Sequence, residues 1–143
     1  MRIQQTRSIQ IYPCLAVLIG TISGAGVPLH ASDDAAPGRS LYITHCSACH
    51  RVNGEGLPGV FPPLKGSGVV NKDDASKHIH AVLDGMSGGT VGGVVYPSAM
   101  PPFAGMLSDA EIADIIDFER SSWGNHGKPV TSAQVTAARS TSK

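Results

Sequence analysis

The chain has 143 residues, of which 41% are hydrophobic and 15% charged, with 11 basic residues against 11 acidic ones. This length suits a single domain with a small core. The neutral balance excludes a nucleic-acid-binding surface, which needs clustered basic residues, and it predicts no strong electrostatic steering toward a partner.

The first 31 residues have the pattern of a signal peptide. Arg2 and Arg7 form a positive start, residues 11–19 are a short apolar run, and Leu29-His30-Ala31 has the small-residue ending of a cleavage site. We therefore expect residues 1–31 to direct export and then to be removed.

Cleavage would leave a mature chain that begins near Ser32, with nine basic residues against eleven acidic ones and a formal charge of −2. The alternative is an uncleaved anchor, although the apolar run carries Pro13 and falls short of the roughly 20 apolar residues of a spanning helix. Cys14 would leave with the peptide, so the mature chain has two cysteines and no disulfide framework.

A first helix is expected from near Pro37 to His50, and it ends in the sequence Cys46-Ser47-Ala48-Cys49-His50. On a helix these cysteines and the histidine fall at i, i+3 and i+4, so both thiols and the imidazole lie on one face. C-x-x-C-H is the attachment signature of a c-type haem, with Cys46 and Cys49 forming thioethers and His50 binding the iron. The alternative is a C-x-x-C zinc or redox pair.

Gly and Pro are frequent from Asn53 to Gly105, which predicts long loops with sharp turns. Within this region a second helix is predicted from Asp73 or Asp74 to about Leu83, with Gly85 as its stop signal. Residues 90–96 predict two very short strands around a Gly-Gly turn.

The third predicted helix has the clearest start, because Ser108 and Glu111 form a capping box. Ile112, Ile115 and Ile116 make an apolar stripe that runs to an end near Trp123. Glu119 interrupts this stripe, so we expect the second half of the helix to be only partly covered. The polar tail, residues 126–143, predicts either a frayed end or one short helix.

The chemistry of the haem depends on its sixth ligand, because a second strong ligand favours electron transfer and an open position permits gas binding or peroxide chemistry. Met100 is the leading candidate, since the prolines around it in residues 96–103 would present its sulfur from a stiff loop. Met86 and Met106 lie beside helix ends, where methionine usually packs. The remaining candidates share an imidazole: His45, His78, His80 and His126. Those at 78 and 80 differ by two positions, so at most one points inward.

Taken in order, these motifs resemble class I cytochrome c. The resemblance rests on Gly38, the C-x-x-C-H sequence, the segment 62–66 (Pro-Pro-Leu-Lys-Gly), the Met-Pro-Pro-Phe sequence at Met100, and the capped helix from Ser108. It implies a mainly α cytochrome c fold, with three to four helices and long loops around one covalently attached haem c. The domain would span residues 32–125, followed by the tail at 126–143.

In finer detail, residues 59–64, the Met-Pro-Pro-Phe sequence and residues 120–125 resemble the haem domains that accompany bacterial periplasmic dehydrogenases, such as the cytochrome subunit of alcohol dehydrogenase. The resemblance also implies that Pro62 and Leu64 contact the cofactor, with the Pro62 carbonyl accepting a hydrogen bond from His50. Gly38 and Phe118 match the place where the first and last helices of the family cross.

The function that the resemblance implies is periplasmic electron transfer without catalysis, with His50 and Met100 as axial ligands of the iron. One electron would pass between a dehydrogenase or respiratory complex and an acceptor such as a terminal oxidase or another cytochrome. We expect no nucleic-acid partner and no membrane span after cleavage. An apolar rim of Val60, Phe61, Val94 and Val95 around the haem edge would favour a docked subunit. A peroxidase-like haem enzyme and a gas-binding module with a displaceable sixth ligand remain alternatives.

Overall fold

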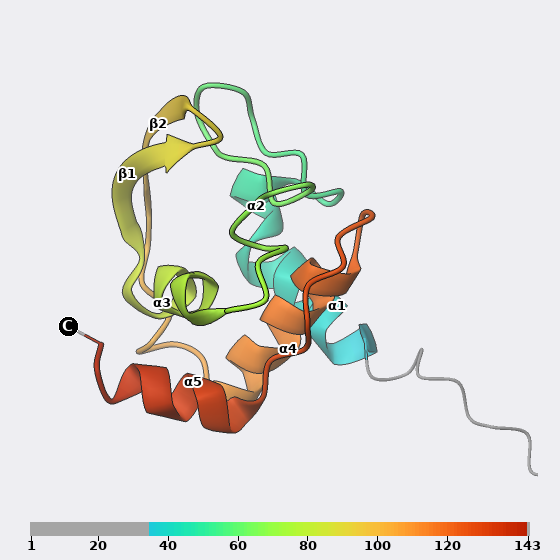
Figure 1. The fold of residues 1–143 in the computed structure, drawn as a ribbon, viewed down its shortest axis with the longest axis vertical. Coiled ribbons are helices and arrows are strands. Elements are labelled where there is room, and N and C mark those ends of the chain that lie inside the picture. The colour runs from blue at the N-terminus through green and yellow to red at the C-terminus, as the bar shows by residue number, and fades with distance from the viewer. Residues whose placement is uncertain (1–34, 143) are drawn as a thin grey trace, which may run out of the picture.

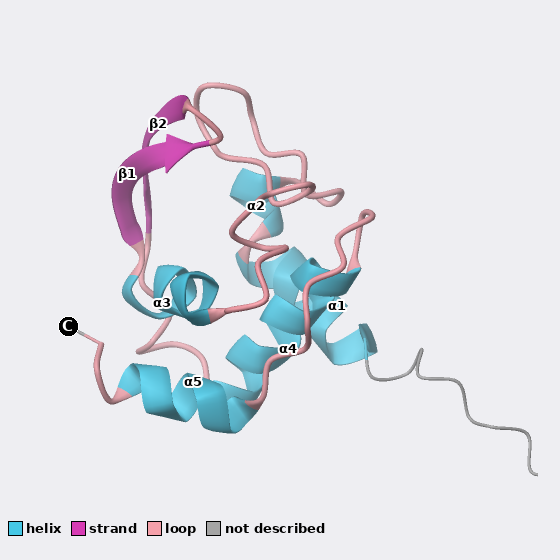
Figure 2. Cartoon of the chain, viewed as in Figure 1, coloured by secondary structure: helices cyan, strands magenta, loops and turns pink. Residues whose placement is uncertain are grey.

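The computed structural model describes residues 35–142 (Figure 1), so the expected signal peptide at 1–31 lies outside the described residues. Five helices and one hairpin follow in the order α1 (Ala35–His45), α2 (Ser47–His50), α3 (Ser76–Asp84), β1 (Met86–Val91), β2 (Val94–Met100), α4 (Asp109–Ser121) and α5 (Ser132–Arg139). Long loops join them (Figure 2), so the expected mainly α architecture is confirmed. The helix count exceeds the expected three to four, because the first predicted helix is divided at Cys46 and the tail is helical.

The first and fourth helices cross at Gly38. A Cβ atom on this residue would collide with the backbone carbonyl of Asp114, and Phe118 lies beside the same point. The missing side chain therefore lets the two backbones approach, as the resemblance implies. Next to the crossing, the Tyr42 ring packs 5.3 Å from the Phe118 ring and 5.1 Å from the Trp123 ring, measured between centroids.

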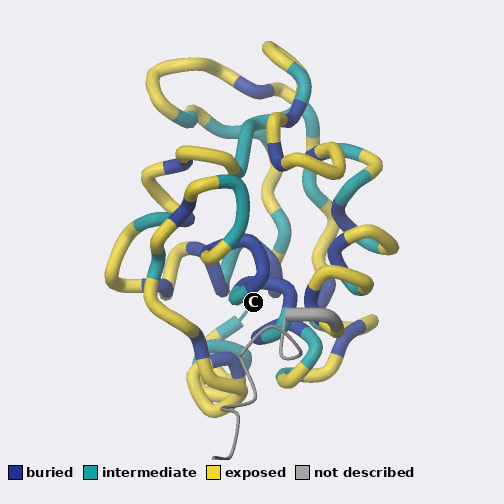
Figure 3. Tube along the Cα trace, turned by 90° about the vertical axis from the view of Figure 1, so that its right-hand side faces the viewer, coloured by how far each residue is buried: buried dark blue, intermediate teal, exposed yellow. Residues whose placement is uncertain are grey.

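Helix α4 is the central element of the core. Its capping box is formed as predicted, with the Ser108 side chain accepting from the Glu111 N–H. Ile112, Ile115 and Ile116 are fully buried, and in Figure 3 the buried segments gather in the interior of the molecule. The expectation that the second half of α4 is only partly covered is wrong, because Glu119 is 3% exposed and its neighbours on either side are also buried.

Helix α3 begins at Ser76, two to three residues later than predicted. The reason is that Asp74 serves as a cap from outside the helix, accepting from the Ser76 N–H at 3.0 Å and from its hydroxyl at 2.6 Å. The helix stops at Gly85, as predicted, where the backbone has a φ of 69°.

The predicted hairpin is present but longer than residues 90–96. Strand β1 pairs antiparallel with β2 from Val91↔Val94 at the tip to Met86↔Met100 at the base, with a bulge between Ser87 and Gly89. Met100 is therefore the last residue of a strand, and not part of a loop as its prolines suggested. Pro97 is tolerated inside β2 because a two-stranded sheet consists of edge strands, whose outer side needs no N–H donor.

The tail folds as one short helix, which is the second of the two expected outcomes. Thr131 and Gln134 form a capping box, and Val135 is fully buried against the core that α3 and α4 build. Arg139 fixes the far end of α5 through Asp109, at 2.6 Å from its Nε atom. Within residues 35–142 no helix combines the length and apolar character that crossing a membrane requires.

Candidate haem site

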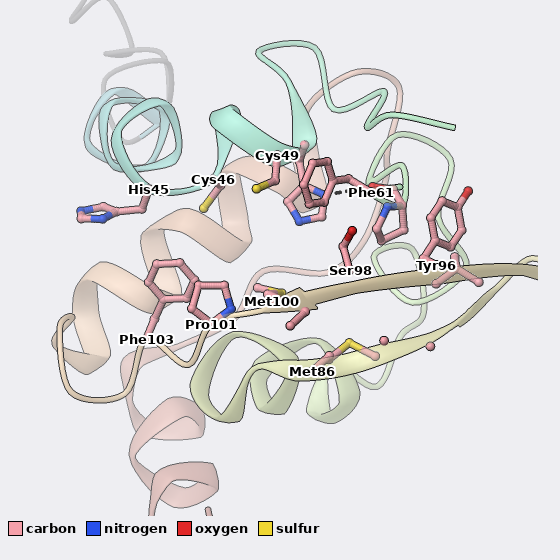
Figure 4. A pocket seen from close by; sticks show the side chains of 16 residues that line it. His45, Cys46, Cys49, Phe61, Met86, Tyr96, Ser98, Met100, Pro101 and Phe103 are labelled. Carbon is pink, nitrogen blue, oxygen red and sulfur yellow. Dashed lines mark hydrogen bonds between the residues drawn. The ribbon is translucent and has the colours of Figure 1, made fainter. Parts of the chain in front are cut away.

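The C-x-x-C-H sequence forms a single helical turn at the end of the α1–α2 segment. The backbone N–H groups of Cys49 and His50 both donate to the Cys46 carbonyl, at 3.2 and 2.9 Å. Figure 4 shows the sulfur atoms of Cys46 and Cys49 turned toward one cavity. After this turn Arg51 adopts a φ of 63°, which ends the helix, and its carbonyl accepts from the Tyr42 hydroxyl at 2.5 Å.

The His50 ring is 8% exposed and is held from behind by the loop that follows it. Its Nδ1 atom lies 2.9 Å from the Pro62 carbonyl oxygen. A carbonyl only accepts hydrogen bonds, so the proton sits on Nδ1 and the Nε2 atom keeps its lone pair. This arrangement selects the tautomer that a metal ligand needs.

The loop behind His50 is fastened to the end of α4. The Asn125 side chain donates to the Leu64 carbonyl at 3.1 Å and to the Glu119 carbonyl at 2.8 Å. Buried Arg120 donates to the Val70 carbonyl at 2.8 Å. Residues 120–125 therefore hold the loop that carries the Pro62 carbonyl. This contact gives a physical reason for the motif at residues 59–64 to occur together with the motif at residues 120–125.

Met100 approaches the same cavity from the hairpin, on the wall opposite the two cysteines in Figure 4. Gly85 makes this approach possible, because a Cβ atom at this position would collide with the Met100 carbonyl oxygen. The backbone φ of 69° at Gly85 also favours glycine. The next residues are fixed to α3, since the Phe103 N–H donates to the Val82 carbonyl at 3.0 Å. The methionine sulfur is thus presented by a segment that is anchored on both sides.

The cavity between these walls has two neighbouring parts, of about 570 and 110 Å³. Six residues line both parts: Cys46, His50, Pro62, Met86, Val91 and Met100. The larger part is also lined by Leu64 and lies within the roughly 300–1,000 Å³ of a small-molecule or cofactor site. Two thiols, one imidazole and one thioether converge on a mostly apolar space, and this donor set fits a covalently attached haem.

The two thiols differ in their surroundings. Burial raises the pKa of the Cys46 thiol far above its usual value, and the nearby Glu119 carboxylate and Cys49 raise it further. Cys46 is therefore a neutral thiol before attachment. A neutral, buried thiol is a poor zinc ligand.

The other predicted ligand candidates lie in less suitable places. Met106 is 60% exposed, and Met86, although it lines the cavity, is 44% exposed. His126 is exposed. His45 borders the smaller part of the cavity next to Cys46, with its ring 6.1 Å from the Phe103 ring.

Of the two histidines on α3, only one points inward, as predicted. The Nε2 atom of His78 lies 2.7 Å from the Glu119 carboxylate, and both side chains are buried. His80 is partly exposed and pairs with Asp84 at 3.0 Å. The sequence analysis missed the buried pair of His78 and Glu119, although the interruption of the α4 stripe by Glu119 was the available signal.

Comparison with known proteins identifies the class. The Cytochrome c family model matches residues 35–123, and the chain belongs to this family. Membership of this family confirms the expected cytochrome c fold and makes the C-x-x-C-H sequence a site of covalent haem c attachment, which decides against the zinc and dithiol alternatives for the C-x-x-C pair.

Particular relatives are similar over most of this chain. It is 36% identical over 115 residues to the alcohol dehydrogenase (quinone) cytochrome c subunit of Gluconacetobacter polyoxogenes, covering 75% of this chain and 23% of the relative. It is 37% identical over 114 residues to the gluconate 2-dehydrogenase cytochrome c subunit of Pantoea cypripedii, covering 77% and 25%. It is 34% identical over 113 residues to cytochrome c-552 of Thermus thermophilus, covering 73% and 85%. The chain thus spans about a quarter of the length of the dehydrogenase subunits that it matches.

Proposed function

We propose that this cytochrome is a periplasmic one-electron carrier in which His50 and Met100 bind the haem iron from opposite sides. The observation that carries the proposal is the convergence of two anchored side chains on one cavity. The His50 ring is fixed by the Pro62 carbonyl at 2.9 Å. Met100 pairs with Met86 of β1, and the segment after it is fixed by the hydrogen bond from the Phe103 N–H to the Val82 carbonyl.

Bound haem supplies a one-electron iron couple, and the chain's own residues decide how that couple behaves. The Pro62 carbonyl orients the His50 imidazole and makes it a stronger donor through Nε2, because it accepts a hydrogen bond from the Nδ1–H group. The Met100 thioether is a soft, neutral ligand, which favours the less charged ferrous state. Cys46 and Cys49 attach the cofactor, and Leu64 and Phe103 help to keep water out of the cavity. If His50 and Met100 both bound the iron, no open position would remain on it for peroxide or gas chemistry.

The axial assignment can be tested with three methionine variants produced with a cytochrome c maturation system. Met100→Ala should abolish the weak, long-wavelength absorption of thioether-ligated ferric haem and lower the reduction potential. Met106→Ala is the matched control and should leave both unchanged, whereas Met86→Ala alters the cavity wall and should keep the absorption band. If Met100→Ala kept the band and Met86→Ala lost it, the proposed sixth ligand would be wrong.

For the partner and the compartment, we propose a periplasmic dehydrogenase as electron donor. Support comes from the similarity of the chain to dehydrogenase cytochrome c subunits and from the exposed valines at 60, 94 and 95. An apolar surface of this kind favours docking to a protein over free diffusion. Mass analysis of the periplasmic protein should find a chain that begins near Ser32. Purification from the native host should yield a dehydrogenase bound to it, and a full-length chain retained in the membrane would contradict the export proposal.

A further inference from the structure

A buried acid–base pair lies beside the proposed haem site and is not used by the axial ligation. The Nε2 atom of His78 on α3 and the Oε2 atom of Glu119 on α4 are 2.7 Å apart. The two residues are 4% and 3% exposed. Charged side chains are rarely buried to this extent unless they are paired, so the contact itself accounts for the presence of both.

The pair borders the cavity that His50 and Met100 also line. The charge of Glu119 acts on this region of the molecule. Burial raises the pKa of Tyr42 above its usual value, and the Glu119 carboxylate raises it further. A charge that reaches the wall of the cavity also interacts with an iron ion inside it, because electrostatic interactions are strong in a poorly hydrated interior.

No second partner competes for Glu119 among the described residues, where His78 is its sole ion-pair or hydrogen-bond partner through the carboxylate. The charge of Glu119 reaches Tyr42 and Cys46 on the α1 side. Three charged or titratable residues of α3 line the same cavity as the pair: Lys77, His80 and Asp84. On α4 the neighbouring charged groups have other partners, since Asp117 accepts from the Val130 N–H and Arg120 donates from Nη1 to the Val70 carbonyl at 2.8 Å.

The pair has room for one further proton. With a single proton shared between Nε2 and the carboxylate, the pair carries one negative charge, and a second proton on the Nδ1 atom of His78 makes it neutral. Nδ1 is buried and has no hydrogen-bond partner within residues 35–142.

We propose that the His78–Glu119 pair takes up a proton when the neighbouring iron is reduced, so that this cytochrome carries a proton with its electron. His78 Nδ1 accepts one proton from water as one electron from the redox partner converts Fe(III) to Fe(II), and reoxidation releases both. Reduction removes one positive charge beside the pair, which makes the added proton more favourable. The inference rests on the proposed function, because it requires the iron to lie between His50 and Met100.

The reduction potential of the holoprotein, measured against pH, tests this coupling. The wild type should show a potential that falls as pH rises across one window, approaching about 59 mV per pH unit if one proton accompanies each electron. His78→Gln should abolish this slope. Glu119→Gln should move the window to lower pH, because the neutral amide no longer favours a charged imidazole. His126→Gln removes an exposed imidazole and should match the wild type.

A wild-type potential that stays constant between about pH 5 and 9, or a His78→Gln protein that keeps the slope, would overturn the proposal. Either result would leave electron transfer intact, whereas failed axial ligation would appear as loss of the thioether absorption band. If the variants do not fold, nitrogen NMR of labelled histidine in the wild type decides the matter. The Nδ1 atom of His78 should be protonated in the ferrous protein at a pH where the ferric protein has lost that proton. An equal protonation state in both forms would refute the coupling.

Discussion

Arg120 offers the sharpest test of how the fold holds the haem loop. Its side chain is 1% exposed, and it makes three hydrogen bonds to backbone carbonyls that belong to two different segments. The Nη1 and Nη2 atoms donate to Val70 and Lys72 at 2.8 and 2.7 Å, and Nε donates to Lys128 at 2.6 Å. Arg120→Met keeps the length and apolar part of the side chain and removes all three bonds.

The loss of stability in Arg120→Met depends on whether the three backbone carbonyls find new hydrogen-bond donors. Hydrogen bonds that involve a charged group contribute about 1.5–3 kcal/mol each, so three independent bonds would give an upper bound near 9 kcal/mol. The Val70 bond is fully buried, while the other two are partly exposed and their carbonyls can bind water after the substitution. Removing the buried arginine charge also removes its desolvation cost. We therefore expect the free energy of unfolding to fall by about 3–5 kcal/mol.

Denaturant unfolding of the holoprotein, followed by far-ultraviolet circular dichroism, measures this difference. Arg39→Met serves as a control, because Arg39 is an exposed arginine on α1 and its substitution should change stability little. A loss below about 1 kcal/mol for Arg120→Met would mean that water replaces the guanidinium without cost, and the reasoning would be refuted.

Two further expectations concern α1. Gly38→Ala should destabilise the protein by about 3 kcal/mol, because the new Cβ atom collides with the Asp114 carbonyl. The control Gly105→Ala places its Cβ atom in open space and should change stability little. Equal stabilities of the two variants would contradict the close helix crossing. Tyr42→Phe loses the hydrogen bond to the Arg51 carbonyl and should cost about 1 kcal/mol at neutral pH. The pKa of Tyr42 is raised above its ordinary value of 10.0 by burial and then by Glu119 and Cys46. As pH rises, the unfolded chain therefore loses the Tyr42 proton before the folded protein does. The stability of the wild type consequently falls as pH rises above that value. The variant should lack this part of the alkaline decline, and an unchanged pH profile would show that Tyr42 does not cause it.

Much of the fold was predictable because its signals are local. The capping box at Ser108, the stop at Gly85 and the Gly-Gly hairpin turn each depend on residues within a few positions of one another. The C-x-x-C-H spacing likewise fixes the cysteines and the histidine on one helical turn without reference to the rest of the chain. Met100 was predicted to lie in a loop but ends strand β2, since prolines favour a loop and the pairing of β2 with β1 depends on the partner strand.

The site's polar lining was not predictable in the same way. Glu119 was expected to mark exposure because, along a single helix, a charged residue in an apolar stripe has no visible partner. Its partner His78 lies on another helix, 41 positions earlier, and the two meet at 2.7 Å only when α3 packs on α4. The free-energy penalty of burying the Glu119 charge is offset only once the contact with His78 forms, and the two residues lie far apart in the sequence. A charged residue within an otherwise apolar stripe of a cofactor-binding domain is therefore better taken as a reason to look for a distant partner than as the edge of the core.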